Sequence, residues 1–84
     1  MALKIQIVTP RGVAHSGEVA DVQAPGELGE FGVLPGHIPV LTALRPGTLT
    51  LRSNDGARKF AIGAGFAEAG PDRVVILTES CGEA

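Results

Sequence analysis

Residues 29–41 read GEFGVLPGHIPVL, a segment that combines turn formers, apolar side chains, one carboxylate and one imidazole. Its three glycines allow the chain to reverse tightly, and we expect them to hold Phe31, Val33 and Leu34 against a β-sheet. Their spacing is not that of a dinucleotide fingerprint, and the Lys-Ser or Lys-Thr pair of a phosphate loop is missing. The segment therefore predicts tight turns in a β-protein.

Short strand patterns flank this segment on both sides. Leu3, Ile5 and Ile7 alternate with polar residues, which is typical of a half-buried strand. Twelve glycines and six prolines interrupt the chain too often for a long helix. The patterns predict strands at residues 3–7, 13–15, 19–24, 38–43, 48–52, 58–62 and 74–78.

The connections between these strands carry their own signals. Ser16-Gly17 indicates a bulge or bend between two strands, and Pro25-Gly26 is expected to open a loop. The apolar run Val74–Thr78 favours a strand that is covered on both faces. Residues 79–84 show no clear pattern.

The clearest hairpin signal is Ser53-Asn54-Asp55-Gly56, because Asn-Asp and Asp-Gly favour the positive φ that tight hairpin turns need. Phe60 and Ile62 should face the core from the return strand. We therefore predict an all-β fold, a flattened β-sandwich or barrel of about eight to ten short, mostly antiparallel strands. Residues 1–84 should form a single domain with a small core and no C-terminal helical hairpin.

Composition and charge exclude several functions. The formal net charge of −2 gives no basic surface for a nucleic acid. No run approaches the roughly 20 apolar residues of a membrane span, and the N-terminal residues lack the core of a signal peptide. The single cysteine, Cys81, cannot form an internal disulfide, which favours a reducing compartment.

No set of residues predicts catalysis, a metal site or a cofactor. Glu27 and Glu30 have no neighbouring nucleophile candidate to serve as an acid–base pair. The two histidines, His15 and His37, lack the cysteines or compact acid cluster of a metal site. Cys81 has no electropositive setting that would activate its thiol.

Five segments, residues 3–10, 17–19, 29–47, 63–68 and 74–79, together resemble the N-terminal β-domain of the epsilon subunit of F-type ATP synthases, called delta in mitochondria. Pro35-Gly36-His37, followed by Leu-Thr-x-Leu-x-Pro-Gly at residues 41–47, is the most specific part. The family usually continues into a helical hairpin that inhibits ATP hydrolysis and in some members binds ATP. Since this chain ends at Ala84, neither property is carried over. It is either a naturally short epsilon or an excised domain, and the absence of a tag favours the first.

The resemblance implies a non-catalytic accessory subunit of the central stalk. It would dock the gamma subunit onto the membrane c-ring and help couple proton- or sodium-driven rotation to ATP synthesis. We expect it at the cytoplasmic face of the inner (plasma) membrane, peripheral and held through the complex. The implied c-ring contacts are Glu30, Phe31 and Gly32, and the implied gamma contacts are Thr9, His37 and Thr42.

Two other functions stand as alternatives to this one. A biotinyl or lipoyl carrier domain is also all-β and of this size, and Lys59 lies near the Asn-Asp-Gly turn as the candidate for modification. However, Lys59 lacks the methionine or acidic neighbours typical of that family. A small-ligand barrel is disfavoured because the chain has few aromatic residues and few polar anchors.

Overall fold

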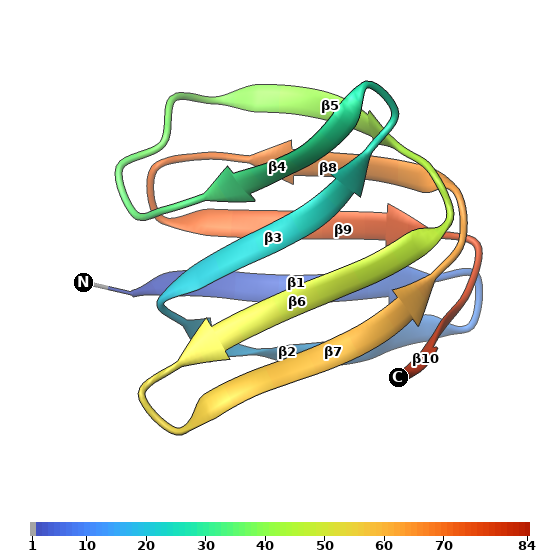
Figure 1. Cartoon of the computed structure of the whole chain (residues 1–84), viewed down its shortest axis with the longest axis horizontal. Coiled ribbons are helices and arrows are strands. Elements are labelled where there is room, and N and C mark those ends of the chain that lie inside the picture. Colours follow the sequence, from blue (N-terminus) through green and yellow to red (C-terminus); the bar gives the residue numbers. More distant parts are fainter. Residues whose placement is uncertain (1) are drawn as a thin grey trace.

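The computed structural model describes residues 2–84, and every regular element in that range is a β-strand (Figure 1). This confirms the predicted all-β class. The strands are β1 (Leu3–Thr9), β2 (Gly12–Val19), β3 (Asp21–Gly26), β4 (Gly29–Val33), β5 (Val40–Leu44), β6 (Gly47–Ser53), β7 (Gly56–Ile62), β8 (Gly65–Ala69), β9 (Arg73–Thr78) and β10 (Cys81–Glu83).

The strands form one sheet that folds over into two layers. Its order is β10-β7-β6-β3-β5-β8-β9-β1-β2, with β4 paired to β3 outside this path. In Figure 1, β3, β6 and β7 cross in front of β8, β9 and β1. Every pairing is antiparallel except that of β1 with β9. The result is the flattened, barrel-like sandwich that was predicted, with extents of 29 × 25 × 21 Å.

The core lies between the layers and is mainly aliphatic. Alternate residues of each strand point inward, so Leu3, Ile5 and Ile7 of β1 are buried while Lys4 and Gln6 are exposed. The other buried apolar residues are Val19, Val22, Ala24, Val33, Leu44, Leu49, Leu51, Phe60, Ile62, Ala67, Ala69, Val74 and Ile76. The predicted inward orientation of Phe60 and Ile62 is confirmed.

Three hairpins use the same turn. The turn residues 10–11, 27–28 and 54–55 are each followed by a glycine with positive φ: Gly12 (115°), Gly29 (136°) and Gly56 (119°). The hairpin predicted at residues 53–56 is therefore confirmed. Within residues 2–84, no residue other than glycine has a positive φ, so neither Asn54 nor Asp55 supplies it. Gly56 does so because it has no Cβ to clash.

Four local predictions were wrong. Ser16-Gly17 lies inside a continuous β2, and the extra residue of the irregular register is Ala14, since Ile7 lies opposite His15 and Val8 opposite Val13. Pro25-Gly26 ends β3 rather than opening a loop. The strand predicted from Ile38 begins at Val40, because Pro39 lies in the connection before it. Residues 81–83, for which no pattern was found, form β10 by pairing with β7.

The strand β9 was also predicted incorrectly, since it is covered on only one face. Val74 and Ile76 are buried, but Leu77 is 46% exposed and points away from the core. The small residues at 63–65 allow a close approach of two backbones, because β8 passes very close to β9. A Cβ on Gly65 would lie 1.8 Å from the Leu77 carbonyl oxygen.

The two phenylalanines of β7 and β8 test which side of each strand faces the core. Phe60 is 4% exposed and Phe66 is 51% exposed. We expect Phe60→Ala to lower the free energy of unfolding by about 3–5 kcal/mol, since it leaves a cavity in a small core. Phe66→Ala should cost less than about 1 kcal/mol. Chemical denaturation of both variants measures the difference, and equal losses would contradict this orientation.

Candidate functional site

The residues singled out by the sequence gather mainly at one groove between β4 and β5. It has a volume of about 610 Å³ and is lined by residues 26–31, His37 and residues 40–43. The two strands lie at the same side of the molecule in Figure 1. They come from different layers and are not paired with each other.

The groove exists because the two layers diverge from a single point of contact. β3 and β5 share one register pair, Gly26 opposite Leu44. Two backbone hydrogen bonds flank it: Glu27 N–H donates to the Ala43 carbonyl at 2.9 Å, and Arg45 N–H donates to the Pro25 carbonyl at 3.0 Å. Beyond this pair β5 continues with β8 alone, so its residues 40–43 border the groove.

The β3–β4 hairpin forms the opposite wall, and Phe31 fixes its position. Phe31 is half-buried and packs against the core. Its ring lies over Gly26, where a Cβ would be 2.9 Å from the Phe31 Cδ1 atom and 2.5 Å from the Gly29 carbonyl oxygen. Only glycine at position 26 leaves room for both contacts.

Glu30 lies on β4, not on a loop as predicted, and it is exposed opposite Pro25. The ion pairs between residues 2 and 84 are Arg52–Asp21 and Arg58–Glu83, so no cation of the described chain neutralises Glu30. Gly32 is also exposed on β4, opposite Gln23, but it does not line the groove.

His37 lies in the connection between β4 and β5 and is half-buried. Its Nδ1 atom is 2.6 Å from the Ile38 carbonyl oxygen, which can only accept a hydrogen bond. Nδ1 therefore carries the proton, and in the neutral ring Nε2 is left as an acceptor. The connection is tied to the β8–β9 turn, because Gly36 N–H donates to the Pro71 carbonyl at 2.7 Å. Leu34 does not pack on the sheet as predicted and is 62% exposed.

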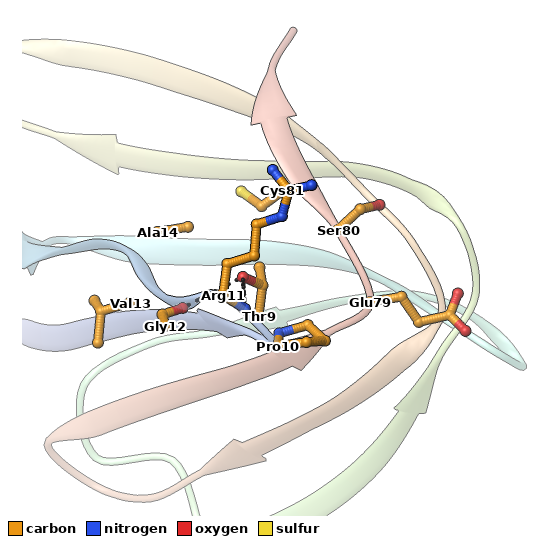
Figure 2. A pocket seen from close by; sticks show the side chains of 9 residues that line it. All are labelled: Thr9, Pro10, Arg11, Gly12, Val13, Ala14, Glu79, Ser80 and Cys81. Atoms are coloured by element: carbon orange, nitrogen blue, oxygen red, sulfur yellow. Dashed lines mark hydrogen bonds between the residues drawn. The ribbon is translucent and has the colours of Figure 1, made fainter.

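The remaining two predicted residues lie in different places. Thr42 is half-buried on β5, opposite Ala67, and borders the groove. Thr9 ends β1 and lines a separate cavity of about 480 Å³ that also includes Arg11 and Cys81 (Figure 2). The Thr9 Oγ1 atom accepts from Arg11 N–H at 3.2 Å. The structure thus brings Glu30, Phe31, His37 and Thr42 together, and Thr9 apart from them.

Sequence reasoning missed the apolar residues of the groove. Leu28 is fully exposed at the tip of the β3–β4 hairpin, and Leu41 is exposed on β5. No pattern pointed to Leu28, because Pro25-Gly26 was expected to open a loop and no strand was predicted at residues 29–33. Apolar side chains next to free carboxylates suit docking to another protein surface.

The described residues do not point to catalysis. Between residues 2 and 84 no cluster of histidine, cysteine and carboxylate side chains could hold a metal ion. Burial raises the pKa of the Cys81 thiol, which keeps it protonated and a weak nucleophile. No helix in this part of the chain is long and apolar enough to cross a membrane.

Lys59 does not have the position that a carrier domain requires. It lies within β7, opposite Thr50, whereas the tip of that hairpin is Asn54-Asp55. The alternative of a biotinyl or lipoyl carrier is therefore not favoured.

Comparison with known proteins identifies the family. The family model described as "ATP synthase, Delta/Epsilon chain, beta-sandwich domain" matches residues 2–84, and the chain belongs to this family. It is 44% identical over 78 residues to ATP synthase epsilon chain 2 of Syntrophotalea carbinolica, covering 93% of this chain and 56% of the relative. It is also 44% identical over 82 residues to the ATP synthase epsilon chain of Caulobacter vibrioides, covering 98% of this chain and 95% of that one.

A solved structure agrees with this assignment. A chain in the mitochondrial ATP synthase of Euglena gracilis, solved as the OSCP/F1/c-ring assembly, superimposes with a TM-score of 0.90 at 25% identity. The match covers 98% of this chain and 53% of that chain. The chain spans little more than half the length of several relatives, although nearly all of the Caulobacter protein. The relatives are epsilon chains, which are accessory rather than catalytic chains of the ATP synthase.

The Phe31–Gly26 contact predicts how the hairpin wall responds to mutation. Gly26→Ala should lower the free energy of unfolding by about 1–3 kcal/mol, because the new methyl group overlaps the Gly29 carbonyl and the Phe31 ring. Gly32→Ala is the matched control on the paired strand, since its nearest neighbour would be the Val22 carbonyl oxygen at 3.8 Å. Thermal unfolding separates the two, and a silent Gly26→Ala would show that Phe31 does not fix the hairpin.

Proposed function

We propose that this chain is an epsilon-type central-stalk subunit that docks the gamma subunit onto the c-ring of an F-type ATP synthase. Family membership and the match to a chain in an F1/c-ring assembly support this function. The observation that carries it is the β4–β5 groove, which places an unneutralised carboxylate, exposed leucines and a half-buried imidazole on one rigid surface.

The hairpin end of the groove is the surface proposed for the c-ring. Glu27 and Glu30 add two exposed carboxylates beside the protruding Leu28. A ring surface with cations next to an apolar recess would complement this arrangement, and charge complementarity mainly sets orientation and association rate. Phe31 would hold Glu30 in place through its contact with the core.

The other end of the groove is the surface proposed for gamma. His37 offers a protonated Nδ1 that is already engaged and a free Nε2 acceptor, which suits a partly buried contact with a polar side chain. Thr42 of β5 lines the same groove. Thr9 would be a second contact point at the far end of β1, outside the groove.

Coupling requires a domain that does not deform when the ring turns. The aliphatic core is closely packed between two hydrogen-bonded layers, which resist shear. The connection that carries His37 is tied to the β8–β9 turn. A rigid domain would then transmit the torque of a ring driven by protons or sodium ions to gamma. The complex would lie at the cytoplasmic face of the membrane.

Charge reversal at Glu30 tests the proposed ring contact. Glu30→Lys should leave the free energy of unfolding within about 0.5 kcal/mol of wild type, since the side chain is exposed. It should weaken binding to a gamma–c-ring complex by about tenfold or more, because it places like charges together. The gamma–c-ring complex is immobilised on a sensor surface, and the dissociation constant of each variant is measured at two salt concentrations.

The control is Asp55→Lys, which makes the same reversal at the exposed tip of the β6–β7 hairpin, away from the groove. It should bind as wild type. Equal binding by Glu30→Lys and wild type would remove Glu30 from the interface. Failure of the wild-type chain to bind either partner would overturn the proposed function as a whole.

A further inference from the structure

The two ends of the sheet meet without a strand ladder. The sheet order begins with β10 and β7 and ends with β2, and no pairing joins β2 to either of them within residues 2–84. One backbone hydrogen bond bridges this side of the molecule near the end of β2, from Ala20 N–H to the Arg52 carbonyl at 2.6 Å. Side chains must close the rest of the seam between β2 and β7.

His15 of β2 makes an aromatic contact across this seam. Its ring centroid lies 5.1 Å from that of Phe60 on β7, with the two planes tilted by 40°. The Arg58 Cζ atom lies 5.2 Å from the same Phe60 ring centroid, and Arg58 forms an ion pair with Glu83 of β10. One aromatic ring therefore links β2 to β7, and through Arg58 to β10.

The charges around His15 differ in sign. Arg58 of β7 repels a proton on the imidazole, and Glu83 of β10 attracts it. Opposite His15 on β1 lies the apolar Ile7, and the only ionisable group that follows on its own strand is Glu18. Arg52 of β6 is bound to Asp21. The strongest charge effect on His15 therefore comes from Arg58.

We propose that His15 makes closure of this seam depend on protonation, independently of the docking function proposed above. The neutral imidazole packs against Phe60 and holds β2 against β7. The imidazolium faces the Arg58 guanidinium, competes with it for Glu83, and releases β2 and β10 from the β7 side chains.

The direction of the pH effect follows from the surroundings of the ring. Burial, and secondly Arg58, lower the pKa of His15 below its ordinary value, while Glu83 partly opposes them. A pKa that is lower in the closed state means that closure is fully stabilised above the open-state pKa of about 6.5. The stabilisation is lost as the pH falls from there through the closed-state pKa.

The experiment combines a histidine NMR titration with amide hydrogen exchange on the 84-residue chain between about pH 7.5 and 5.5, spanning the ordinary histidine pKa. His15 should titrate below the ordinary histidine pKa. The amide protection factors of β2 and β10 should fall as the pH is lowered. At low pH, the factor by which they fall should approach the ratio of the His15 acid dissociation constants in the closed and open states. Those of β8 and β9 should stay constant, because they lie in the middle of the sheet.

Two variants identify the responsible ring. His15→Phe keeps an aromatic ring against Phe60 and removes the titration, so the acid-dependent loss of protection should disappear. His37→Gln removes the other imidazole and should leave that loss unchanged. A His15 pKa at or above its ordinary value in the wild-type chain overturns the proposal, whether or not either variant folds. So does a loss of protection spread evenly over all strands.

Discussion

The register pair between Gly26 and Leu44 is the constraint on which the two-layer structure depends. It is the one pair that joins β3 to β5, and hydrogen bonds from Glu27 and Arg45 lock it on both sides. Because the sheet turns at this point, the inner residues of both layers enclose a common core. Position 26 has no space for a side chain, so the corner is set by main-chain geometry rather than by side-chain packing.

The two sides of the sandwich are closed in different ways as a result. Where β4 and β5 diverge from the corner, the layers leave a groove bordered by Glu30, His37 and Thr42. Where β2 approaches β7, the rings of His15 and Phe60 meet across the seam. The docking proposed for this groove requires walls that do not move. The Phe31 ring over Gly26 and the Gly36–Pro71 hydrogen bond provide that rigidity.

Local sequence patterns predicted the features that depend only on residues close together in the chain, namely strand alternation and tight turns. The alternation of Leu3, Ile5 and Ile7 and the turn at residues 53–56 follow from the chain itself, and both were confirmed. The single-sided burial of β9 was missed, because an apolar run does not show which face meets another layer. The strand β10 and the groove were missed because they depend on the β7–β10 and β3–β5 pairings, which join distant residues.

The two histidines show how far residue type alone can lead. They are the only imidazoles in the chain, and in sequence only His37 lies in a segment that resembles the epsilon family. In the structure, His37 is held by a neighbouring carbonyl beside the groove, whereas His15 packs against Phe60 next to Arg58. The corner at Gly26 and Leu44 is held by backbone hydrogen bonds that do not titrate. Acid can therefore loosen the seam at β2 while the wall that carries Glu30 keeps its shape, because the two closures share no ionisable group.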